Sequence, residues 1–205
     1  MSVGSIESGT VLQPDWDERP IRVLIADEIE VLYDVWWPHT QGWGLTTLNK
    51  KASYYRVRTS FALARAKVVR TEPLSELEQK IHRPDLPLRF CRSRGIRWED
   101  LWSADAKGAD RNENKVAISD EPIDAHELVI VPFGPHGGEK RGVQISSGRE
   151  QGLTALEILR KAAQIQAKQA TSHPEGVGIY RLGIQTRTPS FYLWGPDDRA
   201  GFVRE

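Results

Sequence analysis

Apolar and polar residues alternate over residues 21–37, near the start of the chain. Eight of the nine odd positions in this stretch are apolar or aromatic, and the even positions form a more polar face. A period of two, together with β-branched residues, favours an extended strand. The stretch has seventeen residues. At about 3.3 Å each it is longer than most strands, so we expect a break at 26–28. A helix over 29–36 is the alternative, because apolar residues there also fit a helical spacing.

Further strands are expected along the chain. A second β region is predicted over 52–71, where aromatic and β-branched residues alternate with arginines. The segment 127–133 is apolar on both faces in its centre, which is typical of a strand covered on both sides. Additional strands are predicted over 143–146, 176–185 and 190–194.

Two segments combine helical spacing with helix-boundary signals. A proline stands early in 73–82 and another proline follows it, so a short helix is predicted there. At the start of the segment 155–170, Thr154 and Glu157 match a capping box. Alanines within the segment allow close packing on a sheet. The predicted fold class is therefore α+β: a largely antiparallel sheet of about six strands, packed by one long helix in the C-terminal half and one shorter helix.

The length of 205 residues fits one domain that can bury a core without a disulfide or a metal. Residues 1–19 are polar and lack periodicity, so a flexible N-terminal tail is expected, from which Trp16 can dock on the domain. The single domain is expected over 20–205, with a long polar loop at about 103–125. The one cysteine, Cys91, is expected to be a buried apolar residue. Without a signal peptide or long apolar run, a soluble, cytoplasmic protein that makes no membrane contact is predicted.

Charge is distributed unevenly, although the net charge is zero. Residues 1–49 carry eight acids and two bases, and residues 98–133 carry nine acids and three bases. Residues 50–97 carry thirteen bases and four acids, a net charge of +9. Such segregation indicates either a surface that binds anions or complementary segments that pair inside the fold. In the second case, 52–71 would pair antiparallel with 21–37, and cross-strand Arg–Glu pairs would neutralise both segments.

In the first case, the basic region binds a polyanion. Arginine and lysine neutralise phosphates or carboxylates, and exposed tyrosines between them can stack on bases. Glycines over 134–142 favour an ordinary flexible hairpin loop, and the alternative is that their backbone N–H groups add to an anion site. The candidate anion-binding residues are Lys51, Tyr54, Tyr55, Arg56, Arg58, Arg65, Arg92, Arg94, Arg97, Lys140 and Arg141.

A second hypothesis assigns the carboxylates near residue 30 to a metal. Asp27 interrupts the apolar face of 21–37, so it is either a metal-binding or catalytic carboxylate or a turn residue between two strands. A metal-dependent hydrolase or phosphodiesterase would gather such carboxylates in one pocket with groups from the glycine-rich loop. The residues concerned are Asp27, Glu28, Glu30 and Asp34, with His136, Glu139 and Lys140. Acids on a solvated face are the simpler interpretation, and no metal or other cofactor is expected.

The sequence is compatible with three functions. The favoured hypothesis is a non-enzymatic binding protein that recognises nucleic acid or an acidic protein surface through 50–97. The alternatives are the metal-dependent hydrolase and a protein-interaction partner of the antitoxin or immunity-protein kind, which needs no catalytic site. Trp36, Trp37 and Trp43 can stack on a ligand or serve as core residues, so they do not decide among these functions.

Overall fold

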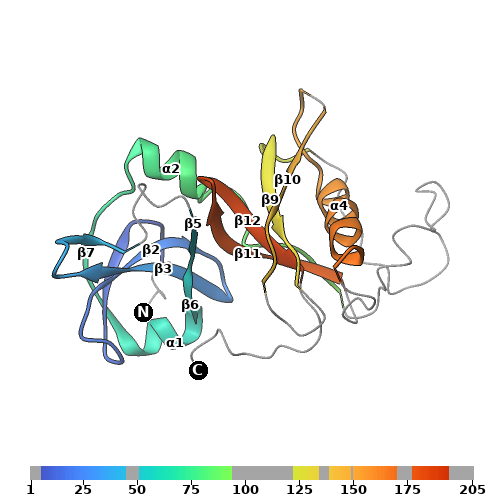
Figure 1. Cartoon of the computed structure of the whole chain (residues 1–205). Coiled ribbons are helices and arrows are strands. Elements are labelled where there is room, and N and C mark those ends of the chain that lie inside the picture. Colours follow the sequence, from blue (N-terminus) through green and yellow to red (C-terminus); the bar gives the residue numbers. More distant parts are fainter. Residues whose placement is uncertain are drawn as a thin grey trace. The chain divides into compact units, whose positions relative to one another are not determined.

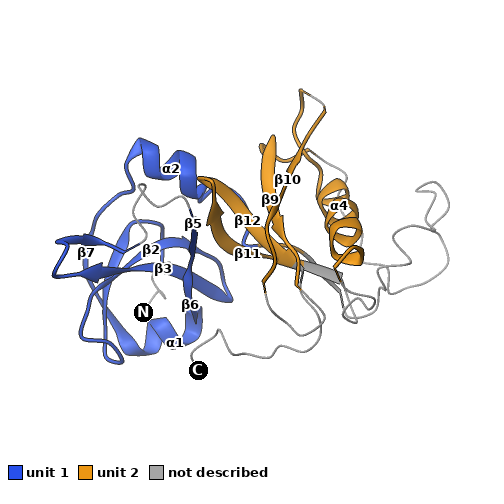
Figure 2. Ribbon diagram, in the orientation of Figure 1, with its two compact units in different colours: residues 1–88, 199–205 blue, residues 89–198 orange. Residues whose placement is uncertain are grey.

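The computed structural model describes residues 6–44, 51–93, 122–133, 139–148, 150–169 and 177–193. These residues form twelve strands in two mostly antiparallel sheets, together with three helices, which confirms the predicted α+β class. The chain divides into two compact units, coloured separately in Figure 2. The described residues up to Leu88 belong to unit 1, and those from Arg89 onward belong to unit 2. The sequence predicted one domain over 20–205 and did not anticipate this division, in which each unit has a buried core of its own.

Unit 1 contains a six-stranded antiparallel sheet (Figure 1). Strands β1, β2 and β3 follow one another in the sheet, and β7 pairs with β1 at the edge. Strand β3 also pairs with β6 through residues 30–33 and with β4 through residues 36–37. The elements of unit 1 are β1 (Thr10–Pro14), β2 (Ile21–Ala26), β3 (Glu30–Trp37), β4 (Gly42–Trp43), β5 (Lys51–Ser53), β6 (Tyr55–Arg58), α1 (Thr59–Arg65), β7 (Ala66–Thr71) and α2 (Glu76–His82).

The long extended segment predicted over 21–37 is two strands, β2 and β3, joined by a turn at the expected place. Asp27 Oδ1 accepts hydrogen bonds from the backbone N–H groups of Ile29 and Glu30, each at 2.8 Å. A short carboxylate that bonds to the backbone two and three residues on stabilises a turn. The strand prediction and the turn interpretation of Asp27 are therefore confirmed, and the helical alternative for 29–36 is wrong.

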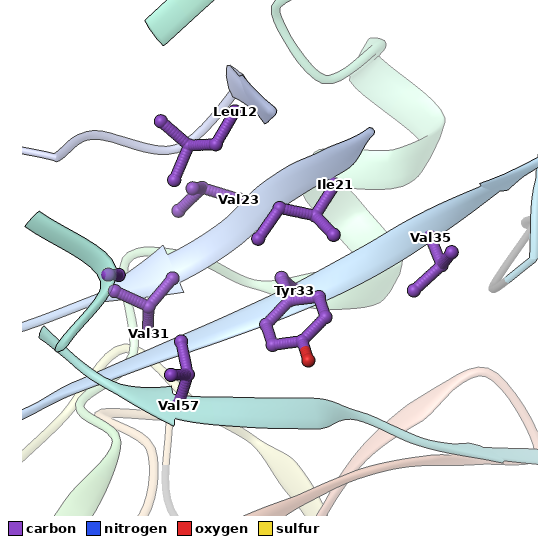
Figure 3. Packing of buried hydrophobic residues seen from close by; sticks show 8 residues of the cluster. Leu12, Ile21, Val23, Val31, Tyr33, Val35 and Val57 are labelled. Carbon is purple, nitrogen blue, oxygen red and sulfur yellow. The ribbon is translucent and has the colours of Figure 1, made fainter. Parts of the chain in front are cut away.

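The core of unit 1 is formed by side chains that alternate along its strands, as a period of two requires. They come from β1, β2, β3 and β6, together with one alanine of α1. Four neighbouring strands of the sheet contribute to this one cluster (Figure 3). The buried cluster consists of Leu12, Ile21, Val23, Val31, Tyr33, Val35, Val57 and Ala62.

The opposite face of β2 and β3 is buried as well, although the sequence predicted a wetter face. Leu24 and Leu32 are fully buried there, together with the charged residues Arg22 and Asp34. The guanidinium of Arg22 bonds to Glu78 of α2, so the helix lies over this face. The charged residues on this face are tolerated because Arg22 pairs with Glu78 and Asp34 accepts a backbone hydrogen bond. An alternation of polar positions therefore does not by itself indicate that a strand face is exposed to solvent.

Two segments of unit 1 differ from their predicted structure. The predicted tail over 1–19 includes β1, whose Val11 and Leu12 are buried between neighbouring strands. The predicted β region over 52–71 is interrupted by helix α1, which begins where the Thr59 hydroxyl bonds to the Asp27 carbonyl at 2.8 Å. Residues 61–64 are all apolar, so the alternation typical of a strand stops inside this helix.

Helix α2 confirms the short helix predicted over 73–82 and begins at Glu76. The Ser75 hydroxyl accepts a hydrogen bond from the Glu78 N–H at 3.3 Å, and the Glu78 carboxylate accepts one from the Ser75 N–H at 2.9 Å. This reciprocal capping box satisfies two N–H groups at the start of the helix. Arg83 then ends the helix in the left-handed conformation, with φ of 44°.

Unit 2 confirms the strands and the long helix predicted in the C-terminal half. The strand order is β10-β9-β12-β11, with β8 also paired to β11, and only β9 and β12 run parallel. The predicted capping box of Thr154 and Glu157 is present at α4, which packs on this sheet. The elements are β8 (Arg89–Ser93), β9 (Glu127–Val131), β10 (Val143–Ser146), α4 (Ala155–Ala167), β11 (Val177–Gln185) and β12 (Thr188–Leu193). The side chain of Cys91 and most of the loop predicted at 103–125 lie outside the described residues.

Candidate binding surfaces of unit 1

The acidic strand β3 and the basic strand β6 are neighbours in unit 1. They pair antiparallel, with Glu30 opposite Arg58. A second arginine of β6, Arg56, is buried, and its guanidinium lies 3.8 Å from the Glu30 carboxylate. The predicted ribbon, in which cross-strand Arg–Glu pairs neutralise the two segments, is therefore confirmed. Because it is buried in this pair, Arg56 does not present its charge at the surface.

Other arginines of the basic region also contact carboxylates. Such exposed pairs add little stability, but each reduces the positive charge that a polyanion would meet. Glu72 and Asp85 are already counted in the net charge of +9 over 50–97. Only the pairs with acids outside this region, Arg65 with Asp15 and Arg56 with Glu30, balance part of that net charge. The pairs are Arg65 with Asp15 at 2.9 Å, Arg70 with Glu72 at 2.9 Å and Arg83 with Asp85 at 2.6 Å.

The remaining anion-binding candidates of unit 1 are divided between surface and interior. Lys51 and Arg58 are exposed. Tyr54 is buried, and its hydroxyl lies 2.8 Å from Nδ1 of His82, so its ring is not available to stack on a base. Tyr55 is 44% exposed and stacks on Tyr33, with ring centroids 5.7 Å apart. Of the two tyrosines proposed from the sequence, only Tyr55 reaches the surface.

The other candidates lie in unit 2 or outside the described residues. Lys140 and Arg141 are exposed, but they belong to unit 2. Arg94 and Arg97 lie outside the described residues, as does the side chain of Arg92.

The carboxylates proposed to bind a metal contact different protein groups instead of facing one common point. Asp27 holds the turn described above, and Glu28 next to it is exposed. Glu30 approaches Arg56, while Asp34 is fully buried and accepts a 2.7 Å bond from the Val35 N–H. Glu139 belongs to unit 2, and His136 lies outside the described residues. Within the described ranges, no group of three or more His, Cys, Asp or Glu side chains is placed to hold a metal ion.

Strand β7 forms an exposed edge of the unit 1 sheet. Of the described strands, only β1 pairs with it. Residues 67–71 are all exposed, and two of them are valines: Val68 is 67% exposed and Val69 is 54% exposed. Val68 lies opposite Leu12 and Arg70 opposite Val11, so Val69 is an extra residue that forms a β-bulge. We call Lys67, Val68, Val69 and Arg70 the edge patch.

A second surface gathers around Arg19, in the loop between β1 and β2. Its guanidinium bonds to Asp17 through Nε and Nη2, at 2.9 and 2.8 Å. The same group lies over the Trp37 ring, 4.4 Å from the centroid. The hydrogen bonds from Arg19 to Asp17 and the charge of Asp17 raise the pKa of Arg19, and they outweigh the opposing effect of burial. We call Asp17, Arg19, Tyr33, Trp37 and Tyr55 the Arg19 site.

Arg22 makes a similar but interior set of contacts. Its guanidinium lies 4.9 Å from the centroid of the Trp43 ring and bonds to Glu78 at 2.5 Å. Glu72 lies 3.7 Å from the same guanidinium and accepts a 2.7 Å bond from Nε1 of Trp43. The Arg22 side chain is only 3% exposed, so this network links β2 and β4 to α2 inside the unit.

Sequence reasoning missed both the edge patch and the Arg19 site. Asp17 and Arg19 were assigned to a flexible tail, and the two valines were treated as ordinary strand positions. One usable signal was the Val68-Val69 pair between Lys67 and Arg70, which breaks the alternation of the surrounding residues.

Comparisons of the chain with protein-family models, with curated proteins and with solved structures give no match. The described helices include none long and apolar enough to cross a membrane.

Proposed function

We propose that this chain is a non-enzymatic binding protein that recognises an acidic, extended segment of a partner protein through the edge patch. The observation that carries the proposal is the exposed strand β7, with two exposed valines between two basic residues. The patch lies inside the basic region 50–97 that the sequence indicated. It differs from the sequence hypothesis in relying on a strand edge and an apolar pair as well as on charge.

An edge strand is suited to this kind of recognition. It presents unpaired backbone N–H and C=O groups, to which an extended segment adds as a further strand. Valines at 68 and 69 offer apolar area to the side chains of such a segment. The bulge at Val69 bends the edge and limits its regular length, which favours a short segment over open-ended association.

The charges of the patch select an acidic segment. If two copies of β7 paired antiparallel about the two valines, Lys67 of one copy would lie opposite Arg70 of the other, and like charges directly opposite are destabilising. Arg70 bonds to Glu72, so its charge is partly balanced, whereas Lys67 is an exposed ammonium group on the same strand. A partner with acids on either side of an apolar pair meets both the valines and the bases.

Nucleic acid is the alternative partner, and the contacts favour it less. Phosphate binding depends on cations that are free to neutralise the backbone. Arg56 is buried against Glu30, and Arg65 and Arg70 already contact carboxylates. The protein-binding proposal uses the valines as well, for which a phosphate backbone has no complementary group.

The test is a binding titration of the full chain by fluorescence anisotropy. The probe is a labelled peptide with the pattern acid–apolar–apolar–acid, SEVIES, and its matched control is SKVIKS. The acidic peptide is expected to bind about tenfold more tightly at low salt, because two attractive cross-strand pairs replace two repulsive ones. Equal affinity for the two peptides, or no binding of either, would overturn the proposal.

A matched pair of variants tests whether the acidic peptide binds at the edge patch. Val68→Asp combined with Val69→Asp is expected to abolish binding of the acidic peptide, because it removes the apolar area and adds negative charge. Leu77→Asp on α2 is the control, since Leu77 is also 54% exposed and lies outside the patch. Loss of binding in the Leu77 variant, or its retention in the valine variant, would contradict the assignment.

Two further measurements separate the alternatives. In the first, the chain is titrated with short DNA and RNA strands at low and moderate salt. Salt-sensitive binding of nucleic acid, without binding of the acidic peptide, would overturn the proposal in favour of a nucleic-acid partner. Light scattering gives the oligomeric state. A dimer that becomes a monomer in the valine variant would identify a second copy as the occupant of the edge and also contradict the proposal.

A further inference from the structure

The Arg19 site is a set of aromatic and carboxylate groups arranged around one cation. A tryptophan face and a bidentate carboxylate both contact the Arg19 guanidinium, at the distances given above. Tyr33 and Tyr55 stack on one another, and both contribute to the electrostatics of Arg19. Aromatic faces and carboxylates are the groups by which proteins recognise guanidinium ions.

The aromatic side chains of the site and the Arg19 cation that contacts them belong to different parts of the fold. Trp37 and Tyr33 extend from β3 and Tyr55 from β6, two paired strands of the sheet. Figure 3 shows the Tyr33 hydroxyl pointing away from Ile21 and Val23, out of the aliphatic cluster. Arg19, in contrast, lies in the loop between β1 and β2, and its ion-pair partner Asp17 is two residues away in the same loop.

The loop backbone is held in place, since the Gln13 amide donates to the Asp17 carbonyl at 3.2 Å and the Arg19 N–H donates to Asp17 Oδ1 at 3.0 Å. The Arg19 side chain can leave the Trp37 ring by rotation about its own bonds, without breaking a strand pairing or moving Asp17. The Arg19 side chain is 33% exposed and Tyr55 is 44% exposed, so the site opens to solvent. A group that arrives from solvent can therefore reach the aromatic faces once Arg19 moves.

We infer that the Arg19 site binds an arginine side chain of a partner protein, and that Arg19 occupies the site as an internal ligand when the partner is absent. Arginine is favoured over lysine, because its planar group matches both the flat Trp37 face and the bidentate geometry of Asp17. The inference is independent of the edge patch, which carries positive charge and selects acidic segments.

An internal ligand lowers the apparent affinity for an external one. The reduction equals the fraction of molecules in which the site is open. If Arg19 fills the site in roughly nine molecules out of ten, its removal is expected to raise the affinity for a free arginine side chain about tenfold. A contact that only stabilises the loop would give no gain, because no binding site would be uncovered.

The test is a titration of the full chain with N-acetyl-arginine amide, followed by NMR at the indole N–H signal of Trp37. That signal is identified by its loss in Trp37→Phe. Arg19→Ala is expected to bind the probe about tenfold more tightly than the unmodified chain does. Adding Asp17→Asn to Arg19→Ala is expected to remove most of this gain, because the bidentate partner is lost.

The matched control is Arg65→Ala. Arg65 likewise contacts an aromatic ring, that of Phe61 at 5.3 Å, and pairs with Asp15 at 2.9 Å, but it lies outside the Arg19 site. No gain in probe binding at Trp37 is expected for this variant. Arg19→Gln, which keeps most of the side-chain stem, repeats the test if the alanine variant fails to fold.

Three results would overturn the inference. In the first, Arg19→Ala, or Arg19→Gln in its place, binds the probe no more tightly than the unmodified chain. In the second, Arg65→Ala shows the same gain as the Arg19 variant. In the third, the matched probe N-acetyl-lysine amide or its trimethyl form binds more tightly than the arginine probe, which would assign the site to an ammonium group instead.

Discussion

Two arginines of unit 1 make nearly the same contacts but differ in burial and in how far along the chain their partners lie. Arg22 lies over Trp43 at 4.9 Å and Arg19 lies over Trp37 at 4.4 Å, and each bonds to a carboxylate. The partner of Arg22 is Glu78, 56 residues away, whereas the partner of Arg19 is only two residues away. The side chain of Arg22 is 3% exposed and that of Arg19 is 33% exposed.

The difference shows that the type of contact does not decide what a residue does. A buried pair between distant segments holds those segments together, and removal of one member leaves a charge in the interior. An exposed pair within one loop adds little to stability, because water screens it. We therefore expect Arg22 to support the fold and Arg19 to be exchangeable, and four experiments test this contrast.

Arg22→Ala is expected to have the largest effect. It leaves Glu78 and Glu72 without the guanidinium that balances them, which costs about 3–5 kcal/mol for a buried pair. The measurement is the free energy of unfolding in urea. Arg70→Ala is the matched control, because Arg70 bonds to the same Glu72 but is 49% exposed. A loss in Arg22→Ala no greater than in Arg70→Ala would refute the structural role of Arg22.

Acid is expected to weaken the same network. Burial raises the pKa of Glu78, but hydrogen bonds from Arg22 and Ser75 outweigh it, so the pKa lies below its ordinary value of 4.5. A carboxyl whose pKa is lowered by folding stabilises the protein fully above its unfolded pKa, and this contribution disappears as the pH falls through the folded pKa. The difference in unfolding free energy between the unmodified chain and Glu78→Gln is therefore expected to be largest above about pH 5.

The same difference is expected to shrink as the pH falls below about 4.5. Urea unfolding at a series of pH values measures it. Glu76→Gln, at an exposed acid in the same helical turn, is the control and is expected to change stability little. A gap for Glu78→Gln that stays constant through this range would contradict the charge pairing with Arg22.

Gly44→Ala is expected to have an intermediate effect and to act on the Arg19 site. A Cβ atom at Gly44 would lie 2.2 Å from Nε1 of Trp37, so the indole must move. Such overpacking costs about 1–3 kcal/mol. Thermal unfolding and the Trp37 indole N–H signal measure the two consequences. Gly42→Ala is the control, since its Cβ would meet only the Thr40 carbonyl at 3.7 Å, and a shift of the Trp37 signal in that variant would argue against the steric explanation.

Arg19→Ala is expected to have the smallest effect on stability, under about 1 kcal/mol, because its ion pair is exposed and local. Urea unfolding measures it under the same conditions as Arg22→Ala. A destabilisation comparable to that of Arg22→Ala would show that Arg19 is a structural residue and would remove the basis for an exchangeable ligand.

Much of the fold was predictable because its signals are local. The period of two over 21–37, the turn at Asp27 and the capping box at Thr154 each depend on residues within a few positions of one another. The pairing of β3 with β6 was also anticipated, because opposite charges in neighbouring segments made it favourable.

The candidate surfaces were less predictable. The basic composition of 50–97 indicated many free cations, but Arg56 is buried against Glu30 and Tyr54 against His82. The position of β7 at the edge of the sheet depends on strand order, and the exposure of Val68 and Val69 depends on which elements pack over β7; alternation along the chain encodes neither.

The sequence by itself determined where the strands turn, where helices α2 and α4 begin and which faces of the strands are apolar. These features follow from backbone preferences and side-chain bonds over short distances along the chain. Tertiary structure decided that the polar face of β2 and β3 is buried, and that Arg22 is buried whereas Arg19 is partly exposed. Those outcomes depend on partners such as Glu78, which comes close to Arg22 only when the chain folds. A pattern of neighbouring residues therefore cannot predict them.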